Sequence, residues 1–574
     1  MLHLIRNAPI SVSVGWHHVG WDKWHGTLVA IRALPAASRR RLADVAGQRE
    51  PSPVGVLALA ADGRRAKALQ ALGNAAQDAG AGRLAQLVSV GAAMDAPQEA
   101  TALLNRLPRD FPGRHRLEAL VAACSGDLTH AAGEARLAGW RANRLQHRLA
   151  GELAGLRVRP GSASRPSQPA LPNHTEGVLH LVTNALPDVT AGYTVRTQGL
   201  VAAQRQIGID AHVVTRLGFP VTAGHVAARS VEHVEGVPYH RLLPPRWLPA
   251  GDHRRLRLDI EQTARLVRQL RPAVLHAHSK YRNAQVALAL RDRYGLPVVY
   301  EVRGFLEETW RSRGRDPGAD AYRLVRECEA HCMSAADVII TLSNSMQAEI
   351  LRRGIPADRV VIVPNAVGNA FLAEPPDATA LRRQLGIDPD DVVVGSVTTV
   401  NDYEGLDVLI EAVAKLQGAT GRARLLVVGA GPAFSALRRQ AADRRLRDAV
   451  FTGAIPFADV RRFYATIDVF AVPRADVPVT RLVAPLKPLE AMATGKPVVA
   501  SDLPPLREIV DDGATGVLVP PGDAGQLATE LEALIADPHG RVRMGREARR
   551  WVQKHRTWSA TALRCQEIYR QLMQ

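Results

Sequence analysis

The sequence predicts an α/β protein in which two domains with parallel sheets follow an all-helical N-terminal extension. Three features predict this class: helical spacing over the first quarter of the chain, a stretch rich in Pro, Ser and Gly after it, and then apolar strands that alternate with amphipathic helices. Since a domain averages about 150 residues, a chain of 574 residues should hold three or four folding units.

The helical extension covers residues 1–156. It is rich in Ala, Leu and Arg at helical spacing, as in 64–73, and it holds few runs of β-branched residues. We expect stacked helical hairpins, in the manner of tetratricopeptide repeats. Such an array either docks a protein partner or only packs against the rest of the chain, and the sequence leaves both alternatives open.

Residues 157–176 replace the helical pattern with Pro, Ser and Gly, which predicts a linker. Two series of strands and helices follow, over 177–370 and 371–574, and their alternation predicts two Rossmann-like domains with parallel sheets covered on both faces. We expect the last helix to pack back on the first of them, and ligands to bind in the cleft that the two sheets form with the carboxyl ends of their strands. The predicted strands are 178–183, 211–215, 274–277 and 298–302, then 392–397, 424–428, 450–452, 469–472, 497–500 and 516–519.

The charge balance, 73 Lys and Arg against 56 Asp and Glu, favours an anionic partner. No apolar stretch is long enough to span a bilayer, and the N-terminus lacks the pattern of a signal peptide, so we expect a cytoplasmic protein, either free or peripheral at the inner face of the membrane. The four cysteines fit a reducing compartment. Cys328, His331 and Cys332 lack a second ligand pair and 388–391 has the composition of a turn, so we expect no metal site.

The segment 485–501 has the pattern of a phosphate site. A helix that begins near Pro485 and ends near Gly495 would present the backbone N–H groups of Leu486 and Lys487 to the cleft. Lys487 is unfavourable for the helix dipole, which favours a bound anion nearby; the alternative is a solvated surface lysine. Glu490 lies one turn further and could accept hydrogen bonds from ribose hydroxyls, or else pair with Lys487.

Several segments resemble retaining GT-B glycosyltransferases of the family 4 type, over about residues 176–574. The resemblance implies a GT-B fold in which 177–370 is the acceptor domain and 371–574 binds a nucleotide-sugar donor without a tightly bound cofactor. Tyr-Glu-Gly at 403–405 and Pro-Leu-Lys-Pro-Leu-Glu at 485–490 are similar to a subgroup that acts in exopolysaccharide or surface-glycan assembly. The matching segments are 490–501, 506–513, 515–520, 425–432, 451–453, 361–365 and 179–183 with the loop at 192–193.

The resemblance also implies site residues. Gly192 would let its loop approach the substrates, unless 191–192 is a plain turn. Arg303, where many relatives carry His, would touch an anionic group or pair with Glu301 or Glu307, and His278 would meet the acceptor or only pack at a strand end. The implied donor-binding residues are Glu490, Leu486, Lys487, Pro485, Gly429, Asn365 and Gly192, and the implied acceptor-binding residues are Gly192, Tyr193, His278 and Arg303.

Two positions depart from the family pattern. Leu482 stands eight residues before Glu490, where the family carries a Glu that contacts the donor sugar, and Glu404 stands where it carries a Lys. We expect Lys487 and Arg474 to supply the missing charge to the leaving diphosphate, unless Arg474 is an ordinary loop arginine. With Arg303, these make the predicted catalytic set.

The expected reaction moves a sugar from a nucleoside diphosphate to an acceptor hydroxyl with retention, by a same-face displacement in which the diphosphate removes the acceptor proton. The acceptor would be a glycan or lipid-linked intermediate, with an anionic membrane surface as a further partner. Nucleic acid is not expected, because no binding motif accompanies the basic residues. Two rivals stay open: a sugar-nucleotide epimerase, and a non-catalytic assembly subunit suggested by Leu482 and Glu404.

Overall fold

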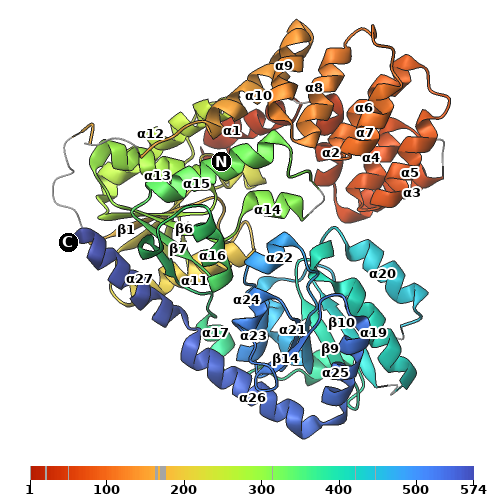
Figure 1. The fold of residues 1–574 in the computed structure, drawn as a ribbon, viewed down its shortest axis with the longest axis vertical. Helices are drawn as coiled ribbons and strands as arrows, with labels where there is room; N and C mark the ends of the chain where they lie inside the picture. The colour runs from red at the N-terminus through yellow and green to blue at the C-terminus, as the bar shows by residue number, and fades with distance from the viewer. Residues whose placement is uncertain are drawn as a thin grey trace.

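The computed structural model describes residues 2–19, 22–48, 51–161, 166–168, 176–312, 315–419, 422–446 and 448–574. Its three parts are the helical extension in red and orange, a first α/β part in yellow and green, and a second in cyan and blue (Figure 1). The predicted linker contains 162–165 and 169–175, which lie outside the described residues. The domain boundaries given above therefore stay predictions.

The extension is built from helices joined by short turns. Side-chain caps begin three of them: Asp22 Oδ1 accepts a hydrogen bond from the backbone N–H of Trp24, Ser52 Oγ from that of Gly55, and Asp127 Oδ1 from that of His130. The helices are α1 (Leu2–Val19), α2 (Lys23–Ala33), α3 (Ala36–Gly47), α4 (Pro53–Ala61), α5 (Arg65–Ala76), α6 (Ala81–Ala93), α7 (Pro97–Asn105), α8 (Arg114–Ser125), α9 (Leu128–Leu137) and α10 (Asn143–Leu156).

The extension packs on the first α/β part through α1 and through α8–α10. Helices α8–α10 share a hydrophobic core with α15 (Asp320–Ala335), through Leu324 and Val325 among others. Helix α1 contributes Ile10 to the core of the first sheet, and Asn7 Nδ2 donates to the carbonyls of Val226 and Ala228, both at 2.9 Å. The extension is therefore fixed to the rest of the molecule by apolar packing and by buried hydrogen bonds.

The first sheet has eight strands in the order β3-β4-β2-β1-β5-β6-β7-β8, parallel except for the β3–β4 hairpin. The predicted strands coincide with β1, β2, β5 and β6, while β3, β4, β7 and β8 were not predicted. The strands are β1 (Val178–Val182), β2 (Ala211–Thr215), β3 (Val231–Val234), β4 (Val237–Arg241), β5 (Val274–His278), β6 (Val298–Val302), β7 (Val338–Thr341) and β8 (Val360–Ile362). The helices are α11 (Gly192–Gln206), α12 (Asp252–Leu270), α13 (Tyr281–Tyr294), α14 (Leu306–Arg311), α15 and α16 (Asn344–Arg352).

The second sheet has six parallel strands in the order β11-β10-β9-β12-β13-β14, with a hydrophobic core on each face. All six were predicted, to within one residue at each end. They are β9 (Val392–Val397), β10 (Ala423–Val428), β11 (Val450–Phe451), β12 (Val469–Val472), β13 (Val498–Ser501) and β14 (Gly516–Val519). The helices are α17 (Asn369–Leu372), α18 (Thr379–Gln384), α19 (Leu406–Ala419), α20 (Phe434–Asp443), α21 (Val460–Thr466), α22 (Pro478–Leu482), α23 (Lys487–Ala493), α24 (Pro504–Arg507), α25 (Ala524–Ala536), α26 (Pro538–His555) and α27 (Trp558–Met573).

These two sheets confirm the predicted α/β class. The segment between β12 and α23 is not a continuous loop, because it contains the short helix α22. Pro478 occupies the first turn, where a missing N–H costs nothing, and Thr480 Oγ1 accepts a hydrogen bond from the backbone N–H of Val477 at 3.1 Å.

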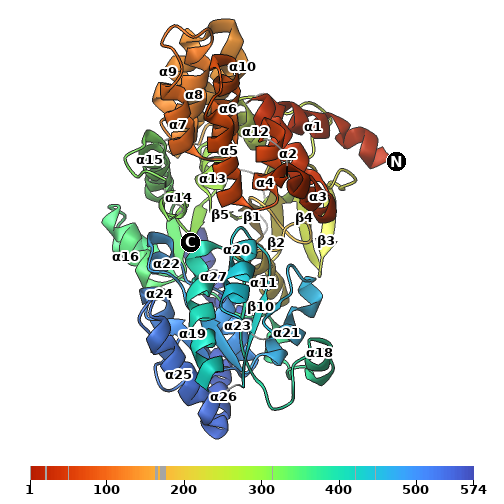
Figure 2. The same cartoon turned by 90° about the vertical axis from the view of Figure 1, so that its right-hand side faces the viewer.

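The C-terminal helix α27 returns from the second α/β part and lies along α11 of the first (Figure 2). Its residues Trp558, Cys565 and Tyr569 belong to the core beneath β1 and β2. The close approach is possible because position 199 of α11 is glycine: a Cβ there would collide with the indole of Trp558. One small residue therefore allows the last helix to cover the first sheet.

Replacing Gly199 with alanine should accordingly lower the melting temperature, with a loss of about 1–3 kcal/mol from overpacking against Trp558. Differential scanning calorimetry measures the melting temperature. Gly133→Ala, in α9, is the matched control, because its Cβ would meet no atom within 4 Å and alanine favours a helix. If both variants melt with the wild type, α27 does not pack on α11 in this way.

Candidate active site

A cavity of about 690 Å³ lies between the two sheets, at the carboxyl ends of β9 and β10. The first α/β part contributes the start of α11 and the second contributes the segment that leads into α23. Of the eleven predicted site residues, ten line the cavity and only His278 does not. The ten are Gly192, Tyr193, Arg303, Asn365, Gly429, Arg474, Pro485, Leu486, Lys487 and Glu490.

The wall of the cavity carries a cluster of three charges. Lys487 Nζ lies 2.9 Å from Glu404 Oε1, and Arg474 Nη2 lies 3.3 Å from the same oxygen. Lys487 also donates to Thr398 Oγ1. Burial raises the pKa of Glu404, but the charges of Arg474 and Lys487 outweigh it and lower that pKa to about 2. Glu404 therefore stays ionised at neutral pH, between two basic side chains.

Glu490, at the end of the first turn of α23, accepts a hydrogen bond from the hydroxyl of Tyr464 at 2.6 Å. Burial raises the pKa of its carboxyl. Tyr464, rather than Lys487, is thus the hydrogen-bond partner among the described residues. Neither Tyr464 nor Thr398 was predicted at the site, because both come from elements far away in the sequence.

Two of the predicted binding residues have a clear structural role. Gly429 has φ +129°, and a Cβ there would collide with the carbonyl of Thr398, so only glycine lets β10 end this close to β9. Asn365 Nδ2 donates to the carbonyl of Ala484 at 3.0 Å, which ties the crossover between the two α/β parts to the segment before α23. Gly192 differs: a Cβ there would meet only Leu486 Cδ1, at an ordinary 3.4 Å. The protein itself does not require glycine at 192.

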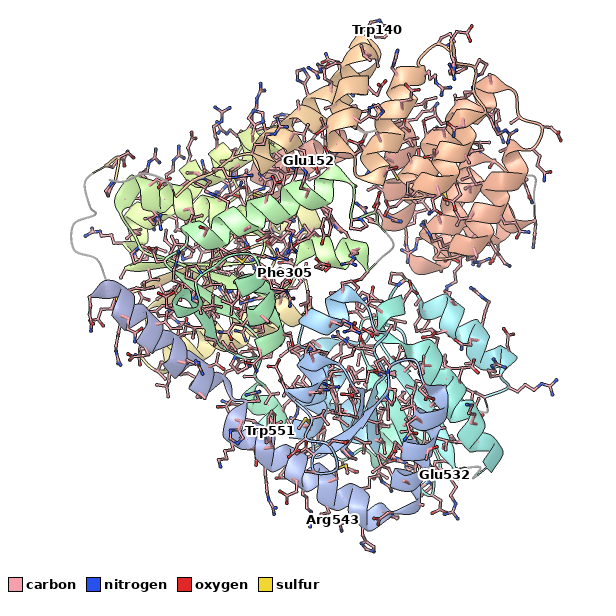
Figure 3. The ribbon with its side chains drawn as sticks, viewed as in Figure 1. Trp140, Glu152, Phe305, Glu532, Arg543 and Trp551 are labelled. Carbon is pink, nitrogen blue, oxygen red and sulfur yellow. The ribbon has the colours of Figure 1, made fainter. Side chains whose placement is uncertain are left out.

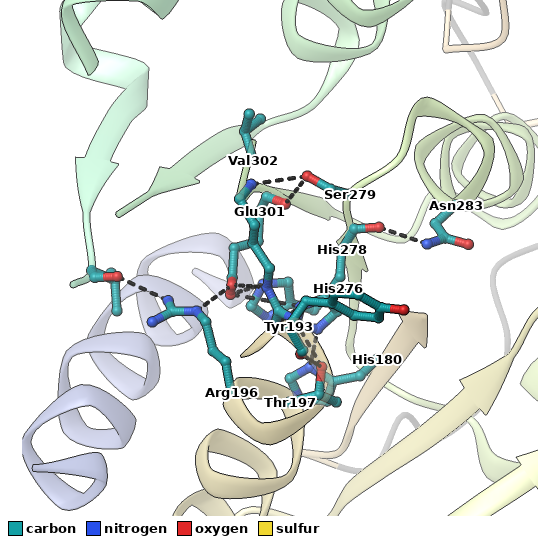
Figure 4. A network of polar contacts seen from close by, with 12 residues as sticks. His180, Tyr193, Arg196, Thr197, His276, His278, Ser279, Asn283, Glu301 and Val302 are labelled. Carbon is teal, nitrogen blue, oxygen red and sulfur yellow. Dashed lines mark hydrogen bonds and ion pairs between the residues drawn. The ribbon is translucent and has the colours of Figure 1, made fainter. Parts of the chain in front are cut away.

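His278 belongs to a buried network behind the cavity (Figure 4). Arg303, which also lines the cavity, is part of the same network. Arg303 Nε pairs with Glu301 Oε1 at 2.5 Å, and Arg303 Nη1 donates to the carbonyl of Tyr193 at 2.7 Å. The ion pair that the sequence offered as the alternative for Arg303 therefore forms with Glu301, while Glu307 pairs with Arg353 at 2.7 Å.

His278 is 1% exposed and lies away from the cavity surface. It contacts the guanidinium of Arg303 and shares a 2.8 Å hydrogen bond with His180. It is thus packed at the end of β5, as the second alternative for this residue had it, and an acceptor in the cavity would not touch it.

Leu482 does not line this cavity. It packs against the core of the first sheet and borders a separate hollow between α14, α16 and α22, with Glu308 and Arg352. The position at which the family pattern has its sugar-contacting glutamate thus faces the first α/β part in this chain.

Cys328, His331 and Cys332, at which the sequence predicts no metal site, have partners within the protein: His331 Nε2 hydrogen-bonds to the carbonyl of Pro160 at 2.8 Å, and both thiols are buried. Within the part of the chain that the structure describes, no helix has the length and apolarity that crossing a membrane requires.

Comparison with known proteins identifies the family. Residues 191–366 match the family model described as Glycosyl transferase 4-like domain, and 377–551 match Glycosyl transferases group 1. The D-inositol 3-phosphate glycosyltransferase of Frankia alni is 30% identical over 386 residues, which cover 63% of this chain and 90% of the relative. The chain belongs to the group 1 glycosyltransferases. The resemblance described from the sequence is confirmed at this level.

A second relative aligns over a shorter stretch of the chain. The GDP-mannose-dependent α-(1-6)-phosphatidylinositol monomannoside mannosyltransferase of Mycolicibacterium smegmatis is 30% identical over 265 residues, 45% of this chain and 68% of the relative. Both family models begin after residue 190, so the helical extension of this glycosyltransferase lies outside them.

Solved structures show the same GT-B fold. Sucrose-phosphate synthase from Thermosynechococcus elongatus superimposes with a TM-score of 0.57 and 24% identity, covering 69% of this glycosyltransferase and 99% of that chain. HepE from Anabaena, in complex with UDP and glucose, gives a TM-score of 0.53 and 19% identity, with 69% and 100% covered.

Proposed function

We propose that this glycosyltransferase moves a sugar from a nucleoside-diphosphate sugar to an acceptor hydroxyl with retention of the anomeric configuration. The observation that carries the proposal is the charge cluster Lys487–Glu404–Arg474, which shares one cavity with Glu490. The two cations would stabilise the leaving diphosphate, and Glu490 would accept hydrogen bonds from the ribose. Relatives named for nucleotide-sugar donors, such as the mannosyltransferase, support this use of the site.

The carboxylates of the cavity favour a same-face displacement. Among the described lining residues they are Glu404 and Glu490, and both are engaged, one by Arg474 and Lys487 and the other by Tyr464. Neither is placed as a nucleophile. In the proposed step the bond from the anomeric carbon to the diphosphate breaks, the acceptor oxygen bonds on the same face, and the departing phosphate oxygen takes the acceptor proton. Lys487 and Arg474 hold the charge that develops on the diphosphate.

We propose a glycan or lipid-linked intermediate of cell-surface glycan synthesis as the acceptor, with the protein acting on the cytoplasmic side of the membrane. The net charge of +17 supports attraction to an anionic membrane surface. The names of the relatives, which act on inositol phosphate or phosphatidylinositol mannoside, are compatible with polar, phosphorylated acceptors.

Thermal shift against a panel of UDP-, GDP- and dTDP-sugars tests the donor site. We expect one nucleotide class to raise the melting temperature of the wild type, because a ligand at 100 times its Kd stabilises by about 2.7 kcal/mol. Glu490→Ala should lose most of this shift, while Glu374→Ala, at a carboxylate that is 92% exposed, keeps it. If Glu490→Ala responds like the wild type, the donor site is wrongly assigned.

One observation favours a second candidate, the non-catalytic assembly subunit. Leu482 points away from the cavity, so the cavity lacks the carboxylate that the family pattern places at the donor sugar. A wild type that binds none of the nucleotide sugars would support this subunit. The other rival from the sequence, a sugar-nucleotide epimerase, would be supported if the protein converted a nucleotide sugar in the absence of any acceptor.

A further inference from the structure

A second cavity, of about 790 Å³, lies where the helical extension meets both α/β parts. We call it the junction chamber. Its walls come mainly from α2, α6 and α8 of the extension, with Glu152 of α10, from the end of α14 and residues that follow it, and from Asn401 and Tyr403 of the second α/β part. Asn401 and Tyr403 also line the candidate active site, so the loop that holds them borders both cavities. The chamber exists only because the extension is present.

We propose that the junction chamber is an acceptor subsite that binds a neutral oligosaccharide and leads it to the active site. This inference rests on the proposed glycosyltransferase function. It gives the extension, which neither family model covers, a role in substrate binding.

The chamber is formed by fixed contacts before any ligand binds. Arg315 Nη2 pairs with Asp95 Oδ1 at 3.1 Å, which joins the segment after α14 to the α6–α7 turn. That turn is held by Arg65, which donates to the carbonyls of Met94 at 2.9 Å and Asp95 at 2.7 Å. Asp320, at the start of α15, accepts hydrogen bonds from the first backbone N–H groups of α9, at 2.6 and 2.8 Å, which joins the extension to the first α/β part. A pre-formed wall of this kind lowers the entropic cost of binding a flexible chain.

The lining has the chemistry that recognises sugar rings. Its aromatic residues are Trp310, with the guanidinium of Arg315 5.5 Å from the centre of its ring, and Tyr403. Aromatic rings can pack against the apolar C–H side of a sugar ring, and ionised side chains can bond to its hydroxyls. The wall holds three arginines and four carboxylates, so its charge is nearly balanced although the whole chain carries +17. A polyanion would gain little there, whereas a neutral polar ligand can bond to both kinds of group. The volume falls within the roughly 300–1,000 Å³ of small-molecule sites.

Glu152, on α10, adds a group that a ligand can use. Figure 3 shows it where the extension meets the first α/β part. Among the described residues, no side chain forms a hydrogen bond or ion pair with its carboxylate, and burial raises the pKa of this group. Because no described side chain occupies it, the carboxyl group of Glu152 is available to accept a hydrogen bond from a sugar hydroxyl.

An array of immobilised oligosaccharides, with neutral and with phosphorylated or sulfated members, tests the inference on the full-length protein. We expect the wild type to bind neutral oligosaccharides, and Trp310→Ala to weaken that binding at least tenfold. Trp140→Ala is the matched control, since Trp140 is 83% exposed at the far end of the extension (Figure 3). Circular dichroism checks that Trp310→Ala folds. If it does not, Arg315→Ala is the second variant, and it should also weaken the binding of neutral oligosaccharides.

The inference is overturned if the wild type binds no neutral oligosaccharide, or if it binds only the anionic members. It is also overturned if Trp310→Ala and Arg315→Ala both bind neutral oligosaccharides as tightly as the wild type does. The nucleotide-sugar thermal shift, run on the same preparations, separates this result from the proposed function. If Glu490→Ala keeps the melting-temperature shift by nucleotide sugars while the wild type binds neutral oligosaccharides as expected, only the donor site is refuted. If the wild type shows the nucleotide-sugar shift, which Glu490→Ala loses, but binds no neutral oligosaccharide, only the junction chamber is refuted.

Discussion

Replacing Lys487 with alanine should slow sugar transfer by about 10²–10³-fold, as removal of one preorganised charge from a developing anion does. Lys487 Nζ is held by Glu404 and Thr398, so its position is fixed before the donor binds. Charge held in place in this way needs no reorganisation when the diphosphate departs. The rate of nucleoside diphosphate release, measured with the nucleotide sugar that stabilises the wild type, reports the effect.

Lys415→Ala is the matched control for Lys487→Ala, because Lys415 is exposed on α19, away from the cavity. It should leave the rate unchanged. A Lys487→Ala variant that folds and turns over within threefold of the wild type would show that the charge on the leaving group is balanced elsewhere. Arg474, the other cation paired with Glu404, would then be the residue to test.

The fold could be predicted where the pattern of apolar residues in the sequence matches their burial in the structure. In the second α/β part most strands are short apolar runs that are buried on both faces, as β9, β12 and β13 are, and all six were predicted. The β3–β4 hairpin was missed because β3, Val-Glu-His-Val, alternates between exposed and half-buried residues at the edge of the sheet. Its place depends on pairing with β4 and not on its own composition.

The site could be predicted only in part. Lys487 and Glu490 lie on one short helix, so a local pattern was sufficient to predict them. The partners that determine their chemistry are distant: Glu404 lies 83 residues before Lys487, and Tyr464 lies 26 residues before Glu490. For Arg303 and His278 the sequence left two alternatives open, since the buried network forms only when β5, β6 and α11 come together.

The network behind the site should also show the largest loss of stability. Glu301 is fully buried, and its Oε1 lies 2.7 Å from Arg196 Nε and 2.5 Å from Arg303 Nε. Glu301→Gln leaves two buried cations without their anion, which should cost about 3–5 kcal/mol. Glu327→Gln, in an exposed pair with Arg323 on α15, is the control and should change the free energy of unfolding by less than about 0.5 kcal/mol.

The pH dependence of this loss follows from the pKa of Glu301. Burial raises that pKa, but the charges of Arg196 and Arg303 outweigh it and hold the pKa well below its ordinary 4.5. Because the folded pKa is the lower one, Glu301 stabilises the fold fully above pH 4.5, and its contribution falls as the pH drops from 4.5 toward the folded value. Guanidinium unfolding at pH 7 and 3.5 should therefore show a smaller difference between wild type and Glu301→Gln at the lower pH. An equal difference at both would mean that Glu301 is not ionised in the fold.

Weaker donor binding should accompany this loss of stability. Arg303 donates to the carbonyl of Tyr193, and Arg196 Nη1 to Asn365 Oδ1 at 3.3 Å, while Asn365 Nδ2 holds the carbonyl of Ala484. Glu301 thus orients two arginines whose other nitrogens hold segments on both sides of the cavity. A Glu301→Gln variant that is less stable but binds the nucleotide sugar with wild-type affinity would show that the network supports the fold without positioning the site.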